Sequence, residues 1–71
     1  MTHQIHSPEE LGQVVRTRRK ALRLTQEELA GVASVTPRLL GEIERGKPTA
    51  QLAGVLRVLA ALGIELEARS R

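Results

Sequence analysis

The chain has no cysteine and no phenylalanine, tyrosine or tryptophan among its 71 residues. The lack of cysteine excludes disulfide bonds and thiolate metal sites. The lack of aromatic side chains leaves leucine, valine, isoleucine and alanine to form the core. A chain this short buries only about 60% of the surface that it exposes when unfolded. We therefore expect one small helical domain, residues 1–71, that gains stability from a second copy of itself.

Other absences exclude whole classes of function. No apolar run approaches the roughly 20 residues of a membrane span, and residues 1–4 lack the basic and apolar layout of a secretion signal. No nucleophile–base cluster, glycine-rich phosphate loop or carboxylate pair indicates an active site. His3 and His6 are three residues apart, but no other candidate ligand lies near them. We expect a cytoplasmic protein that is not an enzyme and holds no metal or cofactor.

Positive charge is the chain's main excess. The formal net charge is +3 and the sequence pI is about 10.6, which suits a polyanionic partner. The charge is concentrated in one short stretch that contains Arg16, Arg18, Arg19, Lys20 and Arg23. This cluster is either a solvated helix face or an edge that faces phosphates.

Residues 25–46 read as helix, tight turn, helix. Thr25 is a good N-cap, and Glu28 three residues later completes a capping box. Thr36 is a second N-cap, followed by Pro37 at the first helical position. Gly46 follows the last apolar position of the second helix, as a helix-ending glycine does. Two short helices joined in this way are typical of a helix-turn-helix unit.

This stretch resembles the lambda-repressor-like (Xre) family. The matching positions are Thr25, Gln26, Leu29, Ala30, Leu40, Ile43, Glu44 and Gly46. The resemblance implies an all-α bundle of four to five helices that docks on double-stranded DNA. Two positions depart from the family: Ser34 stands where most members have a glycine at positive φ, and Gly41 lies inside the second helix of the unit.

The flanking segments complete a bundle over residues 7–63, after a lead over residues 1–6. In the first helix, Ser7 caps, Pro8 follows and Glu10 completes a capping box. Its predicted core residues are Leu11, Val14, Val15 and Leu22. The last helix is expected to start at Thr49 as N-cap and to end at Gly63. Its predicted apolar face consists of Leu52, Val55, Leu56, Leu59, Ala60 and Leu62, with Val58 and Ala61 off that face.

Residues 64–69 alternate between apolar and polar side chains, which predicts a short β-strand in the C-terminal segment, residues 64–71. A single strand needs a partner for its backbone groups, so we expect it to pair with the same segment across a homodimer. The expected interface residues are Val55, Leu59, Leu62, Ile64, Leu66 and Ala68. The alternatives are a frayed tail and, for the last helix, a face that forms only core.

The resemblance also implies roles for individual residues. Gln26 would bind a backbone phosphate, and the loop residues Arg45 and Lys47 would do the same. Base-contacting positions fall on Thr36, Pro37, Arg38 and Glu42. Arg38 is the best candidate, because arginine reads guanine O6 and N7 with two hydrogen bonds. Glu42 would accept from cytosine N4, repel phosphates or simply turn outward. Arg19 and Glu44 would form a structural ion pair.

Two further stretches narrow the resemblance to HipB-type antitoxins: Ile5–Pro8 before the first helix and Leu62–Leu66 after the last. That group implies a homodimer that represses its own operon from a palindromic operator and binds a HipA-like serine/threonine kinase toxin. A stand-alone Xre regulator without a toxin is the first alternative. A protein-interaction scaffold that uses the fold without DNA is the second.

Overall fold

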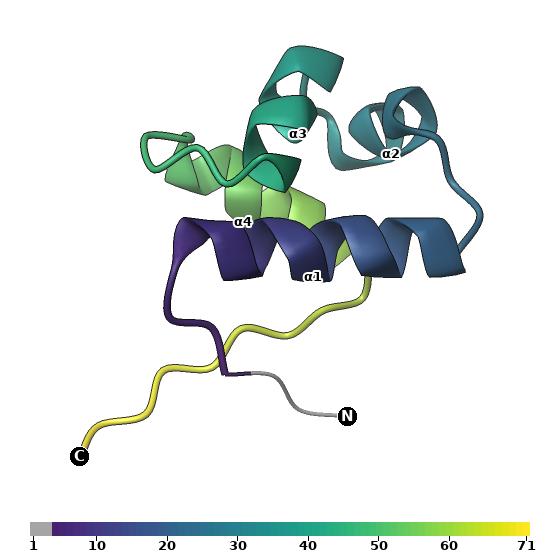
Figure 1. The fold of residues 1–71 in the computed structure, drawn as a ribbon. Coiled ribbons are helices and arrows are strands. Elements are labelled where there is room, and N and C mark those ends of the chain that lie inside the picture. Colours follow the sequence, from purple (N-terminus) through teal and green to yellow (C-terminus); the bar gives the residue numbers. More distant parts are fainter. Residues whose placement is uncertain (1–3) are drawn as a thin grey trace.

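A computed structural model describes residues 4–71, and within this range the chain forms four helices. They are α1 (Pro8–Ala21), α2 (Gln26–Ala33), α3 (Pro37–Glu44) and α4 (Leu52–Ala61). α1 packs against α3, while α2 packs against both α3 and α4. Figure 1 shows α2 and α3 on one side of α1, joined by a tight turn. The all-α helix-turn-helix bundle is thus confirmed, with the lower of the two expected helix numbers.

The helix starts follow from their capping residues. The Thr25 hydroxyl accepts from the Glu28 N–H at 3.1 Å, and the Glu28 carboxylate accepts from the Thr25 N–H at 2.8 Å. Thr36 caps α3 in the same manner, accepting from the Leu39 N–H at 3.0 Å. These caps satisfy backbone donors that have no partner within the helix. The predicted starts of both helices are confirmed.

The cap of α1 differs from the prediction in one bond. The Ser7 hydroxyl accepts from the Glu10 N–H at 3.1 Å, as expected. The Glu10 carboxylate, however, accepts from the backbone N–H of His6, one residue earlier, at 3.1 Å. His3 lies outside the described residues, so its spacing to His6 has no structural counterpart.

The turns among the described residues use four backbone positions with positive φ. Ser34 has φ 57° and ψ 43°, so this serine adopts the positive φ at which most members of the family have glycine. Gly46 ends α3 at φ 79°, and Gly63 follows α4 at φ 71°. Arg23 also has a positive φ, 59°, in the turn after α1. An arginine there is mildly strained, and no sequence signal indicated it.

The core is wholly aliphatic and is shared by all four helices. The residue of α1 that is fully buried is Val15, and Leu22, predicted as core, is 41% exposed. Leu22 lies beyond the end of α1, where the chain turns away. The buried apolar residues are Val15, Leu29, Ala30, Ala33, Leu40, Ile43, Val55, Val58, Leu59 and Leu62.

The last helix begins later and is rotated relative to the prediction. Its N-cap is Gln51, which makes no side-chain capping bond, so the assignment of Thr49 as cap was wrong. Val58 is fully buried, whereas Leu52 and Leu56 are 66% and 43% exposed. Val58 therefore belongs to the core face, and Leu52 and Leu56 lie off it.

Residues 64–71 form no strand in this single chain, so the predicted strand is not confirmed. The segment leaves α4 and passes α1 on the side away from α3 (Figure 1). Together with α1 it lines an open groove whose apolar residues include Leu11, Val14, Ile64 and Leu66. No helix within residues 4–71 is long and apolar enough to cross a membrane.

Candidate nucleic-acid interface

The outward side of α3 and the residue after it carry charged residues expected to contact DNA. Arg38, Glu42 and Arg45 follow one another at helical spacing, four and three residues apart. The opposite side of the helix is buried through Leu40 and Ile43. The fold therefore gives this helix one side for the core and one side for a partner. Thr36 and Pro37 lie exposed at its N-terminal end.

A carboxylate and two cations meet on this outward side. The Glu42 Oε2 accepts from the Lys47 Nζ at 3.0 Å and lies 3.6 Å from the Arg38 Nε. The hydrogen bond from Lys47 lowers the pKa of the Glu42 carboxyl, and the nearby positive charges of Arg38 and Arg45 lower it further. Glu42 is therefore ionised at neutral pH. Its side chain is only 17% exposed, whereas that of Arg38 is 88% exposed.

Gly41, which the sequence left unexplained, lies beneath the side chain of Arg45. A Cβ atom at Gly41 would stand 3.0 Å from the Arg45 Nη1 and 3.7 Å from its Cζ. The glycine thus lets the guanidinium group lie close against the helix. Because the obstacle is the far end of a flexible side chain, a larger residue here would displace Arg45 rather than the backbone.

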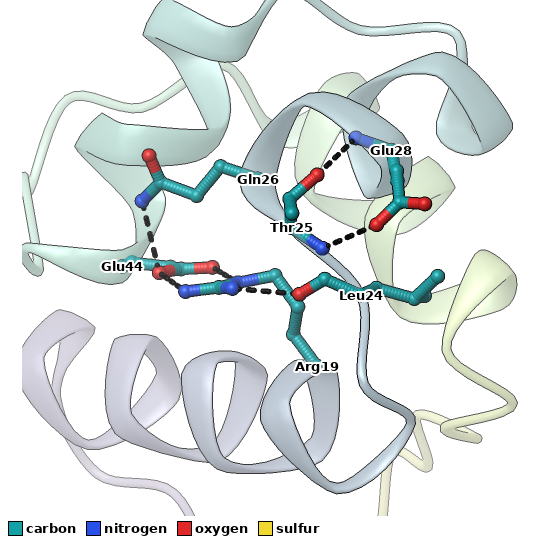
Figure 2. A network of polar contacts seen from close by, with 6 residues as sticks. All are labelled: Arg19, Leu24, Thr25, Gln26, Glu28 and Glu44. Carbon is teal, nitrogen blue, oxygen red and sulfur yellow. Dashed lines mark hydrogen bonds and ion pairs between the residues drawn. The ribbon is translucent and has the colours of Figure 1, made fainter.

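A second polar network joins α1, α2 and α3 (Figure 2). The Arg19 guanidinium donates to both Glu44 oxygens, at 2.7 and 3.0 Å, and to the Leu24 carbonyl at 2.8 Å. The two side chains are 10% and 2% exposed, which places the predicted ion pair inside the fold. Its two parallel hydrogen bonds are the strong, directional form of an arginine–carboxylate contact.

Gln26, the first residue of α2, shares this carboxylate. Its Nε2 donates to the Glu44 Oε1 at 3.1 Å. Burial raises the pKa of the Glu44 carboxyl, but the hydrogen bonds from Arg19 and Gln26, together with the positive charges of Arg19 and Arg16, outweigh it, and the pKa is lowered. One carboxylate therefore holds the expected phosphate-binding glutamine in a fixed place.

The basic cluster of α1 divides into residues with structural contacts and residues without. Arg19 is in the buried ion pair, and the Arg18 Nε donates to the Leu62 carbonyl at 3.1 Å. That carbonyl lies at the C-terminal end of α4, so Arg18 ties α1 to the last helix. In the sequence, Arg18 falls at a position of α1 that helical spacing assigns to the apolar side, and this pattern could have indicated its structural contact. Arg16, Lys20 and Arg23 are exposed.

The residues predicted to form the dimer interface are not all on the surface. Val55, Leu59 and Leu62 are 7%, 3% and 1% exposed, because they pack in the core of the single chain. They are therefore removed from the expected interface. Leu66 is 63% exposed and Ala68 is exposed, while Ile64 is partly buried against the core.

Comparison with known proteins tests the resemblance directly. The family described as "Helix-turn-helix domain" matches residues 10–71, nearly the whole chain. The chain belongs to this helix-turn-helix family. It is 46% identical over 67 residues to "Uncharacterized HTH-type transcriptional regulator y4mF" of Sinorhizobium fredii, covering 94% of this chain and 88% of that protein.

Solved structures with the same fold include complexes that contain HipB. A "HipB-O4 20mer complex" matches with a TM-score of 0.87 and 20% identity over 97% of each chain. A "HipA-HipB-O2-O3 complex" matches with the same TM-score, identity and coverage. The helix-turn-helix assignment is confirmed, and the fold is like that of HipB.

Proposed function

We propose that this helix-turn-helix protein is a sequence-specific DNA-binding transcriptional repressor. The observation that carries the proposal is the division of α3, which buries Leu40 and Ile43 while presenting Arg38, Glu42 and Arg45 outward. Gln26 begins α2 nearby, and the N-terminus of a helix favours an anion such as a phosphate. The y4mF relative, called an HTH-type transcriptional regulator, supports the same role.

The contacts divide by chemistry. Arg38 would donate two hydrogen bonds to guanine O6 and N7, and Thr36 and Pro37 would meet bases at the end of the helix. Gln26, Arg45 and Lys47 would bind phosphates. In this division Arg38 sets the sequence preference, whereas the phosphate contacts set register and total affinity.

The repressor would act as a homodimer on a palindromic operator. Residues 64–71 support this assembly, because they keep the apolar and polar alternation of a strand while Leu66 stands exposed. Pairing of two such segments would satisfy backbone groups that one chain leaves open. The two copies of α3 would then lie about 34 Å apart, one turn of DNA.

The finer proposal is that this repressor is the antitoxin of a HipBA-type pair. The HipB-like fold and the presence of HipA beside HipB in one matched structure support it. The partner would be a HipA-like serine/threonine kinase. The alternatives are a stand-alone Xre-family regulator and, with less support, a protein-interaction scaffold without DNA.

Two experiments test the proposal. The first measures binding of the purified chain to a duplex from the region upstream of its own gene and to a scrambled duplex, across a salt series. Binding that prefers the upstream duplex and weakens with salt is expected. Arg38→Ala should lower this preference by about 1–3 kcal/mol, whereas Lys47→Ala should weaken both duplexes alike and reduce the salt slope by about one unit.

The second experiment isolates the tagged protein from its host and weighs the chains that elute with it in a fixed ratio. A kinase-like chain released only by denaturant is expected for the antitoxin. A homodimer that elutes alone would leave a stand-alone regulator. If no duplex were bound in the first experiment, the repressor itself would be rejected in favour of the scaffold.

A further inference from the structure

Glu42 is the one carboxylate on the outward side of α3, and it lies among cations. Lys47 donates to its Oε2 at 3.0 Å, and the Arg38 Nε lies 3.6 Å from the same oxygen. Both cations are expected to contact DNA, on the proposed function on which this inference rests. In the free protein the Glu42 carboxylate thus accepts the hydrogen bond that Lys47 would donate to a phosphate oxygen on DNA.

This arrangement has an energetic consequence for any DNA that the protein meets. A phosphate that recruits Lys47 must displace the Glu42 carboxylate and then lie beside its negative charge. Non-specific binding depends almost wholly on phosphate contacts, so it bears this cost in full. On a cognate site the Glu42 carboxylate would itself accept from a cytosine N4 amino group, and this contact offsets the cost only where that base is present.

We propose that Glu42 is a specificity-determining residue that acts as an internal substitute for phosphate and suppresses binding to non-cognate DNA. The competing role for Glu42 is to orient Lys47 and Arg38 for DNA. A carboxylate with only this role would strengthen binding to every sequence. The two roles predict changes of opposite sign when the charge is removed.

The test replaces Glu42 with glutamine, which keeps the size and removes the charge. The matched control is Glu67→Gln, which makes the same charge change on an exposed residue of the C-terminal segment, on the side of α1 away from α3 (Figure 1). Both variants and the wild type are titrated with two duplexes. One is the duplex that the wild type enriches most from a random pool, and the other is its scrambled sequence.

We expect Glu42→Gln to bind the scrambled duplex about three- to tenfold more tightly than the wild type does, since it loses a surface ion pair and a repulsion from phosphate. Binding to the selected duplex should change less than twofold. The salt slope for the scrambled duplex should steepen by about one unit. Glu67→Gln should change both duplexes equally and only slightly.

Two outcomes would overturn the inference while leaving the repressor intact. One is an unchanged ratio of affinities in Glu42→Gln, and the other is weaker binding of both duplexes. A wild type that enriches no duplex would instead reject the proposed function. Thermal melting of each variant shows whether a change in binding comes from loss of the fold.

Discussion

At the scale of single residues, Glu44 is the carboxylate of α3 that binds side chains of both α1 and α2. It accepts from Arg19 and from Gln26, and its side chain is 2% exposed. Glu44→Ala would leave the buried Arg19 guanidinium without its counter-ion. We expect a loss of about 3–5 kcal/mol in the free energy of unfolding, measured by urea denaturation. A variant that kept the wild-type midpoint would contradict the structural role of this pair.

The same carboxylate predicts a pH dependence. The pKa of Glu44 is lower in the folded chain than the ordinary value of about 4.3. A group with a depressed folded pKa contributes stability above its unfolded pKa, and this contribution is lost as the pH falls through the folded value. The free energy of unfolding of the wild type should therefore exceed that of Glu44→Gln at neutral pH, and this difference should shrink below about pH 4. Urea denaturation of both chains across that range measures the difference, and a constant difference would contradict it.

Glycine at position 12 permits the close approach of α1 and α3. A Cβ there would lie 2.5 Å from the Ile43 carbonyl oxygen and 2.7 Å from that of Glu44. Backbone atoms cannot move aside cheaply, so Gly12→Ala should cost about 1–3 kcal/mol of stability. Gly31 on α2 has nothing within 4 Å of its would-be Cβ. Gly31→Ala should thus stabilise by up to about 1 kcal/mol. If the denaturation midpoints of Gly12→Ala and Gly31→Ala moved in the same direction, the predicted difference between these two glycines would be wrong.

At the scale of elements, two threonines predicted as N-caps differ in the structure, and only one of them caps a helix. Thr25 closes a capping box with Glu28, whereas Thr49 lies in the loop before α4 and caps nothing. Thr25→Ala should cost about 1 kcal/mol of stability. Thr49→Ala should leave it unchanged within about 0.5 kcal/mol. Chemical denaturation of the two variants makes the comparison, and equal losses would contradict the observed start of α4.

The capped helices were predictable because their signals are local. A hydroxyl followed three residues later by a partner defines the start of α2, and a glycine at positive φ defines the end of α3. The rotation of α4 was not predictable in this way. Arg57 is its single polar side chain, so almost any face satisfies the apolar pattern. Packing against α2 decides the face, and this contact is not local in sequence.

The candidate interface likewise contains features that the sequence predicts and features that it does not. The resemblance implied Arg38 and Glu42 as positions that contact DNA, and the inward-pointing Leu40 and Ile43 agree with an outward place for them. The ion pair of Glu42 with Lys47 could not be predicted, because Lys47 lies beyond the helix and reaches back only through the turn at Gly46. The hydrogen bond from Gln26 to Glu44 likewise could not be predicted, because it joins two helices whose relative orientation is not evident from the sequence.

At the scale of the whole molecule, the proposed homodimer depends on the C-terminal segment, residues 64–71. Leu66 is exposed, and within the described residues no backbone hydrogen bond is made by residues 65–71, after the bond from the Ile64 N–H to the Leu59 carbonyl. Leu66→Lys should shift the proposed dimer toward monomer, because a charge would replace an apolar contact. The matched control, Glu65→Lys, changes a neighbouring exposed residue of the opposite face. Sedimentation velocity over a concentration series measures the shift, and equal behaviour of both variants would argue against pairing through residues 64–71.

The two-sided character of α3 also bears on how such proteins change over generations. Leu40 and Ile43 maintain the fold, while Arg38 and Glu42 face away from it. Substitutions on the outward side leave the buried side intact, so a duplicated gene is free to acquire a new DNA target without first losing a folded product. Glu44 has no such freedom, since it belongs to the fold and holds Gln26 at once. Divergence among descendants should therefore accumulate at positions 38 and 42 and stay rare at position 44.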